Sequence, residues 1–319
     1  MSLEKVTIPE KTATGVAHSK LILVGEHAVV HGQPAISIPF PLIGVESVVE
    51  RVPGGVYLDS SFYAGPMESA PKILTGIVHT IKQTLKLLHI PYENLLIRIH
   101  SSIPPGKGLG SSASVAIAVV KSLFTFSEKP YTNEQVLQLA NISETYAHGA
   151  PSGIDSLTIT SPSPIWYRKE QPIDYITPNG DFYFVVADTG RKADTRTAVE
   201  MVTGLIKTAP KKAYGTMERI GEITYQVREA LEKSGKQVLG FLLNEAQKEL
   251  ESIGVSDKSL NRLIYFARQE GALGAKLTGA GHGGCMIALA QNEAHAMLLS
   301  EKLKQFGAHD VWPFALKNE

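Results

Sequence analysis

Apolar, β-branched segments bounded by turn residues predict strands in the first third of the chain. Residues 35–38 and 43–49 are rich in β-branched side chains, and prolines and the Gly54–Gly55 pair lie between and after them. Residues 95–100 form another compact strand candidate. Between these segments, residues 72–88 carry apolar side chains at helical spacing. This part of the chain is therefore expected to combine strands with an amphipathic helix.

Two further helices are predicted before residue 150. Small and apolar side chains at residues 112–124 follow a Pro-Pro-Gly loop and have helical spacing. Thr132 and the glutamine three residues after it form a capping box, in which each side chain satisfies the other residue's backbone N–H. The helix that opens there is expected to end near His148, because Gly149 and then Pro151 follow.

The second half of the chain is dominated by helical patterns. Residues 182–187 are apolar on both faces, which predicts an internal strand before the pattern changes. This change places a boundary near residue 180 between domains at 1–180 and 181–319, which share an interface because no low-complexity linker separates them. The expected elements beyond it are helices at 213–233, 238–252, 259–269 and 292–306, and strands at 285–290 and 311–314.

Composition narrows the functional classes. The chain has 319 residues, of which 43% are hydrophobic and 19% charged, so packed cores are expected. Its formal net charge of zero gives no general attraction to nucleic acid or to an anionic membrane. Cys285 is the single cysteine, which excludes an intramolecular disulfide and fits a reducing compartment. With no signal peptide at residues 1–11 and no membrane-length apolar run, we expect a soluble, cytoplasmic protein.

The most informative segment is the glycine-rich run at residues 104–114, Pro-Pro-Gly-Lys-Gly-Leu-Gly-Ser-Ser-Ala-Ser. Three glycines within five residues let a backbone approach a ligand closely. Ser111 or Ser112 then opens a helix whose first N–H groups lack internal partners, and such a helix start attracts phosphate. The spacing is not that of a Walker A loop, and Ser111 replaces the third glycine of a dinucleotide fingerprint. An ordinary glycine-rich turn is the alternative interpretation.

A second glycine-rich loop lies at residues 276–285, in the other half of the chain. Four glycines among six residues directly before a strand indicate a backbone that lies close to a ligand or to another segment of the protein. The alternative is a tight packing corner. One such loop in each half favours a ligand site between the two domains.

Two carboxylates and one lysine are candidates for chemistry. Glu144 lies in the last turns of a predicted helix, where the helix dipole disfavours a carboxylate. A nearby metal ion or exposure to solvent would each explain its presence there. Asp155 lies in a turn expected before a strand and is either catalytic or a turn cap. Lys20 is either an edge lysine or a group that stabilises developing negative charge. His27 and His31 stand four apart, but the His-Glu-x-x-His pattern of zinc proteases is absent.

Taken together, these segments resemble the GHMP kinases, the small-molecule kinases named for galactokinase, homoserine kinase, mevalonate kinase and phosphomevalonate kinase. The three family motifs correspond to residues 20–32, 104–114 and 276–285. Residues 25–32 and 148–155 are most similar to the mevalonate kinase branch. The resemblance implies an α+β fold of two domains, the first with a left-handed β-α-β unit and the second ferredoxin-like, although right-handed crossovers are the norm.

The resemblance also implies roles for individual residues. Asp155 is expected to engage the substrate hydroxyl as the catalytic carboxylate, with Lys20 paired to it, and Ser112 and Glu144 are expected to bind Mg²⁺. Expected to contact ATP are Pro105, Gly106, Lys107, Gly108, Leu109, Gly110, Ser111 and Ser112, and expected to contact the substrate are Glu26, His27, Thr195, Gly279 and Ala280.

The reaction implied is ATP-dependent phosphorylation of the primary hydroxyl of mevalonate, giving 5-phosphomevalonate and ADP for isoprenoid precursor synthesis. A homodimer is implied by the resemblance alone. The alternatives are a sister kinase acting on phosphomevalonate or homoserine, a dinucleotide-dependent oxidoreductase, and a non-catalytic sensor of nucleotides or sugars. The presence of Lys20, Glu144 and Asp155 together argues against a sensor, because a binding protein needs no proton acceptor.

Overall fold

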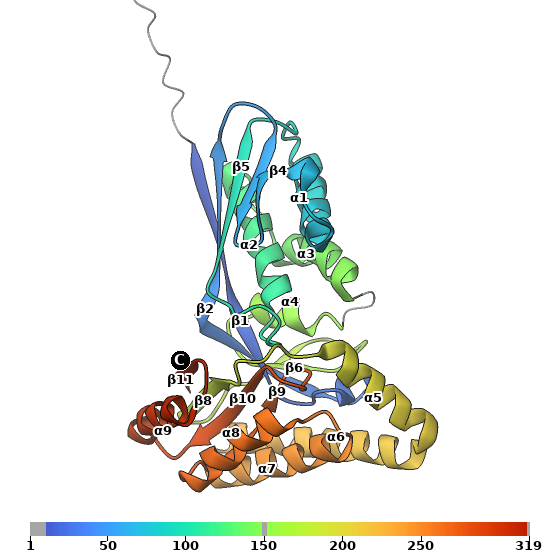
Figure 1. Cartoon of the computed structure of the whole chain (residues 1–319), viewed down its shortest axis with the longest axis vertical. Coiled ribbons are helices and arrows are strands. Elements are labelled where there is room, and N and C mark those ends of the chain that lie inside the picture. Colours follow the sequence, from blue (N-terminus) through green and yellow to red (C-terminus); the bar gives the residue numbers. More distant parts are fainter. Residues whose placement is uncertain (1–10, 149–151, 318–319) are drawn as a thin grey trace, which may run out of the picture. The chain divides into compact units, whose positions relative to one another are not determined.

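The computed structural model describes residues 11–148 and 152–317, which form two compact units (Figure 1). The first unit takes the chain up to His18 together with Ile43–Ile103 and Ser111–Thr160, and the second takes Ser19–Leu42, Pro104–Gly110 and Ser161 onward. Strands β1 (Thr12–Val24) and β2 (Ala35–Arg51) each supply residues to both units. The units are thus interleaved along the chain and differ from the sequential domains 1–180 and 181–319, which stay a prediction.

In the first unit, the carboxyl-terminal part of β2 belongs to a mixed sheet, in which the strand order is β4-β3-β5-β2. Residues Val45–Arg51 pair antiparallel with β5 (Leu95–Ser101), and β5 pairs parallel with β3 (Val56–Ser60). The hairpin partner of β3 is β4 (Tyr63–Pro66), which the sequence pattern did not predict. A parallel pair needs a crossover, and this one runs through α1 (Thr75–Leu88), after the short 3₁₀ segments Met67–Ser69 and Lys72–Leu74. The handedness of this crossover stays a prediction.

Helices α1, α2 (Ser111–Phe126) and α3 (Asn133–His148) pack on one another in this unit (Figure 1). The predicted capping box is confirmed. The Gln135 N–H donates to Thr132 Oγ1 at 3.2 Å, and the Thr132 N–H donates to Gln135 Oε1 at 2.9 Å. The residues expected to stop this helix, Gly149 and Pro151, lie outside the described residues.

The second unit contains a four-stranded antiparallel sheet in the order β11-β8-β10-β9. Helices lie between β8 and β9 and between β10 and β11, so the chain follows the β-α-β-β-α-β order of a ferredoxin-like fold, as predicted. The strands are β8 (Phe182–Asp188), β9 (Gly274–Thr278), β10 (Cys285–Ala290) and β11 (Val311–Leu316), and the helices are α5 (Thr195–Thr208), α6 (Pro210–Glu232), α7 (Lys236–Ser252), α8 (Lys258–Gln269) and α9 (Glu293–Phe306). Of these helices, α5 was not predicted.

Strands β8, β9 and β10 are buried along nearly their whole length, and β8 and β10 are nearly continuous apolar runs. Successive side chains on a strand point to opposite faces. Val185 of β8 joins the core cluster formed with the helices, whereas the neighbouring Phe184 stacks on Phe314 at 5.4 Å between ring centroids. Phe314 in turn meets Phe40 of β2 at 5.2 Å. The prediction of an internal strand at 182–187 is therefore confirmed.

Smaller elements complete the second unit. β6 (Ile165–Tyr167) pairs antiparallel with Ala35–Ser37 of β2, and β7 (Asp174–Tyr175) pairs with β6. Cys285 begins β10 opposite Asp188 in the β8–β10 register. Burial, with the Asp188 charge as a smaller contribution, raises the pKa of the Cys285 thiol well above its usual range. Within the described residues, no helix is both long enough and apolar enough to span a bilayer.

One prediction of local structure was wrong. Asp155 was expected in a turn before a strand, but it is the second residue of the short helix α4 (Ile154–Ile159). The segment is rich in β-branched residues, which favour strands in general. Its packing in the first unit against α2 and α3 decides otherwise, because Ile154, Thr158 and Ile159 are buried together on the helix.

Two helical glycines give a matched test of the packing between α7 and β9. A Cβ at Gly240 in α7 would lie 2.6 Å from the backbone of Leu273, whereas a Cβ at Gly204 in α5 would meet nothing within 4 Å. Helix propensity favours alanine at both positions by about 1 kcal/mol. We expect Gly204→Ala to raise the free energy of unfolding by about that amount and Gly240→Ala to lower it by about 1–3 kcal/mol through overpacking. Denaturant titrations of both variants measure this, and equal shifts would contradict the close approach.

Candidate active site

The predicted site residues divide between the two compact units. Lys20, Glu26, His27, residues 105–110, Thr195, Gly279 and Ala280 belong to the second unit, and Ser111, Ser112, Glu144 and Asp155 belong to the first.

Lys20 lies in β1, next to the first glycine-rich loop. Its side chain is only 2% exposed, so the interpretation as an ordinary edge lysine is wrong. The Lys20 N–H donates to the Leu109 carbonyl at 3.3 Å, and the Ser19 hydroxyl donates to the same oxygen at 2.6 Å. These two bonds fix the loop beside the backbone of Lys20.

Glu26 forms a buried ion pair with Lys276 of β9, a residue that was not predicted to belong to the site. The Lys276 ammonium donates to Glu26 Oε1 and also to the Leu277 carbonyl at 2.6 Å. Burial raises the pKa of the Glu26 carboxyl and lowers that of the Lys276 ammonium, and their mutual attraction opposes both shifts. Within the described part of the chain, Glu26 Oε2 has no hydrogen-bond partner, so it can accept a bond from a ligand.

His27 connects the first family motif to the second glycine-rich loop. Its Nε2 lies 2.8 Å from the Ala280 carbonyl oxygen, and because a carbonyl only accepts, Nε2 carries the proton. Loss of hydration lowers the pKa of the imidazole to about 4, so the ring is neutral at pH 7. His27 also has a φ of 60°, which is uncommon for a residue other than glycine. The histidine is therefore held firmly in the turn that follows Glu26.

The first glycine-rich loop needs its glycines. Gly106, Gly108 and Gly110 have φ of 69°, 76° and 76°, in the left-handed region that other residues avoid. Gly108 also packs against the second loop, because a Cβ there would lie 3.2 Å from Gly279 Cα. The two loops are therefore in backbone contact within the second unit.

The second glycine-rich loop is also a packing corner, which was the alternative interpretation. A Cβ at Gly281 would overlap the Val255 carbonyl, and one at Gly283 would lie 2.5 Å from the carbonyl of Lys192. The segment that contains Lys192 leads to Thr195, the exposed first residue of α5. Asp194 caps this helix by accepting the Thr197 N–H at 2.9 Å.

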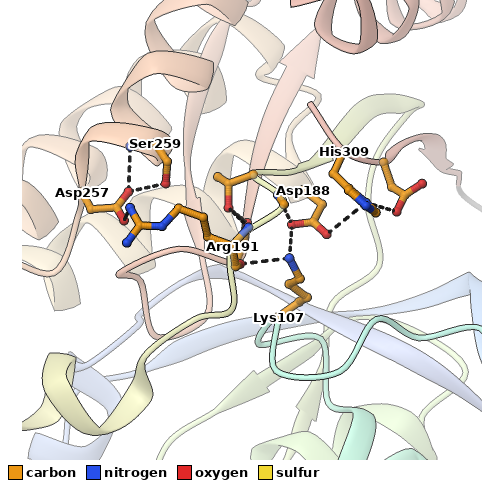
Figure 2. Close-up of polar contacts among 10 residues, drawn as sticks. Lys107, Asp188, Arg191, Asp257, Ser259 and His309 are labelled. Atoms are coloured by element: carbon orange, nitrogen blue, oxygen red, sulfur yellow. Dashed lines mark hydrogen bonds and ion pairs between the residues drawn. The ribbon is translucent and has the colours of Figure 1, made fainter. Parts of the chain in front are cut away.

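The ammonium of Lys107 is bonded to other residues of the protein (Figure 2). It donates to Asp188 Oδ1 at 2.7 Å and to the Arg191 carbonyl at 2.9 Å. Lys107 is 8% exposed and Asp188 is 1% exposed. Sequence reasoning expected Lys107 to contact ATP, and it missed Asp188 because residues 81 positions apart show no joint pattern.

In the first unit, the predicted metal ligands and the catalytic carboxylate lie on helices. Ser112 is the second residue of α2 and half-buried, and Asp155 is half-buried near the start of α4. Glu144 of α3 is 5% exposed, so the interpretation as an exposed glutamate is wrong. Carboxylate and hydroxyl oxygens are the ligands that Mg²⁺ prefers, and a buried carboxylate gains from a cation. The chemistry of Ser112 and Glu144 therefore fits a magnesium ion.

Known proteins match this chain over nearly its whole length. The family model of the GHMP kinases N terminal domain matches residues 73–161, and that of the GHMP kinases C terminal matches residues 227–309. A mevalonate kinase from Pyrococcus abyssi is 31% identical over 308 residues, covering 90% of this chain and 91% of the relative. A mevalonate kinase from Thermococcus gammatolerans is 33% identical over 297 residues, covering 86% and 88%.

A solved structure extends the likeness to three dimensions. The crystal structure of L. major mevalonate kinase in complex with R-mevalonate has a TM-score of 0.84 and 28% identity, and the match covers 99% of each chain. The family models fall one in each half of the chain, and the predicted motifs at residues 104–114 and 276–285 lie within them. With sequence, fold and motif order in agreement, the chain belongs to the GHMP kinase family.

Proposed function

We propose that this protein is the kinase that transfers the γ-phosphoryl group of ATP to the primary hydroxyl of mevalonate, giving 5-phosphomevalonate and ADP. The observation that carries this function is the identity of 31% to a mevalonate kinase across 90% of the chain. The buried carboxylate of Glu26 supplies a hydrogen-bond acceptor for a substrate hydroxyl. A phosphorylated substrate such as phosphomevalonate needs additional Lys or Arg in its pocket.

In this proposal the second unit supplies charge stabilisation and substrate contacts. The N–H groups of residues 106–110 bind the phosphates of ATP, and Lys20 stabilises the negative charge that develops during transfer. Glu26 accepts a hydrogen bond from the substrate through Oε2, while Lys276 holds its other oxygen. His27, Thr195, Gly279 and Ala280 complete the substrate contacts.

The first unit supplies the proton acceptor and the metal ligands in this proposal. Asp155 accepts the proton of the substrate hydroxyl as the oxygen forms its bond to the γ-phosphorus. The bond between that phosphorus and the bridging oxygen breaks, and ADP leaves with the electron pair. Ser112 and Glu144 hold Mg²⁺, which neutralises charge on the phosphates when bound. We further propose that the protein acts in the cytoplasm, in isoprenoid precursor synthesis, and as a homodimer.

The substrate and the catalytic carboxylate are tested in one assay of ADP release. MgATP is offered with mevalonate, phosphomevalonate, homoserine or galactose, and Asp155→Ala is run beside the unchanged protein. We expect turnover on mevalonate, reduced about 10²- to 10⁴-fold in the variant because the proton acceptor is lost while the glycine loop stays intact. Glu93→Ala, which changes an exposed carboxylate of the first unit, is the control. Near-normal turnover of Asp155→Ala would remove this residue from the mechanism.

The metal ligands are tested by titrating Mg²⁺ at fixed ATP and mevalonate. Ser112→Ala and Glu144→Ala should raise the Mg²⁺ concentration needed for half-maximal turnover by about 10- to 100-fold, because each removes one oxygen ligand. Ser111→Ala, the neighbouring serine, is the matched comparison and should shift the titration less. A larger shift for Ser111→Ala than for Ser112→Ala would move the ligand assignment to Ser111.

The low pKa of His27 predicts a loss of stability in mild acid. The folded protein binds the imidazole proton only near pH 4, whereas an unfolded histidine binds it near 6.5. The unfolded state therefore holds more protons between these values, and stability falls as pH decreases through that window. From pH 7 to pH 5, His27 should account for about 2 kcal/mol of the loss in unfolding free energy. Denaturant titrations of His27→Gln at both pH values should show a smaller loss than the unchanged protein, and identical losses would contradict the assignment.

A further inference from the structure

Three segments of the second unit meet around the side chain of Lys107. They are the first glycine-rich loop, the end of β8 with the segment 189–194 that leads to α5, and the second glycine-rich loop before β10. Ala193 N–H donates to the Gly106 carbonyl at 2.7 Å. Gly284 N–H donates to the Arg191 carbonyl at 2.9 Å, and a Cβ at Gly284 would lie 3.0 Å from the Lys107 carbonyl oxygen. The backbones thus interlock, and Lys107 is the charged residue of the first loop that enters this junction.

The ammonium group of Lys107 is buried and has hydrogen-bond partners within the protein. An ammonium has three donors, and two of them are used by Asp188 Oδ1 and the Arg191 carbonyl (Figure 2). Asp188 Oδ1 also accepts the Gly190 N–H at 2.9 Å, which fixes the carboxylate where β8 ends. A buried carboxylate is tolerated only with such partners. The other carboxylate oxygen, Asp188 Oδ2, lies 4.0 Å from Nδ1 of His309.

We propose that Lys107 is a positioning residue, which acts through Asp188 to hold the glycine loop at residues 106–110 in the shape that binds the phosphates of ATP. We name the Lys107 ammonium, Asp188 and the Arg191 carbonyl together the loop clamp. In this role the Lys107 side chain does not contact the nucleotide. The inference rests on the proposed function, because it takes ATP as the ligand of the loop.

A substitution of Asp188 distinguishes positioning from direct phosphate binding by Lys107, because the two roles predict changes of opposite direction in the KM for ATP. If Lys107 contacted the phosphates directly, Asp188 would only weaken its positive charge. Asp188→Asn would then lower the KM for ATP or leave it unchanged. If the clamp positions the loop, Asp188→Asn weakens ATP binding as Lys107→Met does.

We expect Lys107→Met and Asp188→Asn each to raise the KM for ATP about 10- to 100-fold, since small displacements of a binding loop have effects of this size. The KM for mevalonate should change less than about 3-fold. The double variant Lys107→Met/Asp188→Asn should be no worse than either single variant, because both changes break the same contact. The surface pair Lys248–Glu245, at 2.6 Å and with side chains 65% and 33% exposed, gives the matched control Lys248→Met/Glu245→Gln.

The double variant also keeps the test sound if a single variant does not fold, because it leaves no unpaired charge buried. Its thermal melting curve is measured beside its KM for ATP. A folded double variant with an unchanged KM for ATP would overturn the clamp, and so would a lowered KM in Asp188→Asn. Direct titration of the unchanged protein with ATP separates the two proposals. ATP binding without turnover on mevalonate rejects the proposed substrate and leaves the clamp testable by binding, whereas absence of ATP binding rejects both.

Discussion

Burial of strands β8, β9 and β10 is the constraint on which the second unit depends. One face packs against helices, and aromatic rings cover part of the other. A polar side chain on either face therefore has to find a partner inside the protein. Lys276 meets Glu26, and Thr278 of the same strand donates to the Ile22 carbonyl at 2.9 Å. These bonds give the buried polar groups of β9 their partners, and they attach the first family motif, residues 20–32, to the sheet.

The glycine-rich loops obey a second constraint, which is the close approach of backbones. Three glycines in the first loop adopt left-handed conformations, and Gly108 lies against Gly279 with no room for a side chain. Loops of this kind are set by steric fit as much as by ligand contact. The glycines thus let the two loops touch each other. In the proposed function the first of these loops binds the phosphates of ATP.

Local signals in the sequence predicted much of the fold. The capping box at Thr132 and the internal strand at 182–187 are confirmed, because each depends on neighbouring residues. The ferredoxin-like order of the second unit, which is also confirmed, was implied by the resemblance to the family and not by local signals. The helix that carries Asp155 was not predicted, since β-branched residues there mimic a strand until tertiary packing is known.

The site was predicted by residue type and motif, but its contacts were not. The burial of Lys20 and Glu144, the partner of Glu26 and the partner of Lys107 all depend on side chains far apart in the sequence. A single sequence carries no signal for such pairs. The glycine spacing indicated a phosphate loop, yet nothing in it indicated that the lysine within the loop is held by an aspartate 81 residues later.

The position of Cys285 makes the only thiol of the chain a reporter of opening in the second sheet. The residue is fully buried where β10 begins, between Asp188 on one neighbouring strand and Thr278 on the other. Its raised pKa keeps the sulfur protonated, and a protonated, buried thiol reacts slowly with alkylating reagents. Modification therefore requires the edge formed by these three strand ends to separate. The rate of thiol labelling then measures how often this edge, which also carries Asp188, opens in the folded protein.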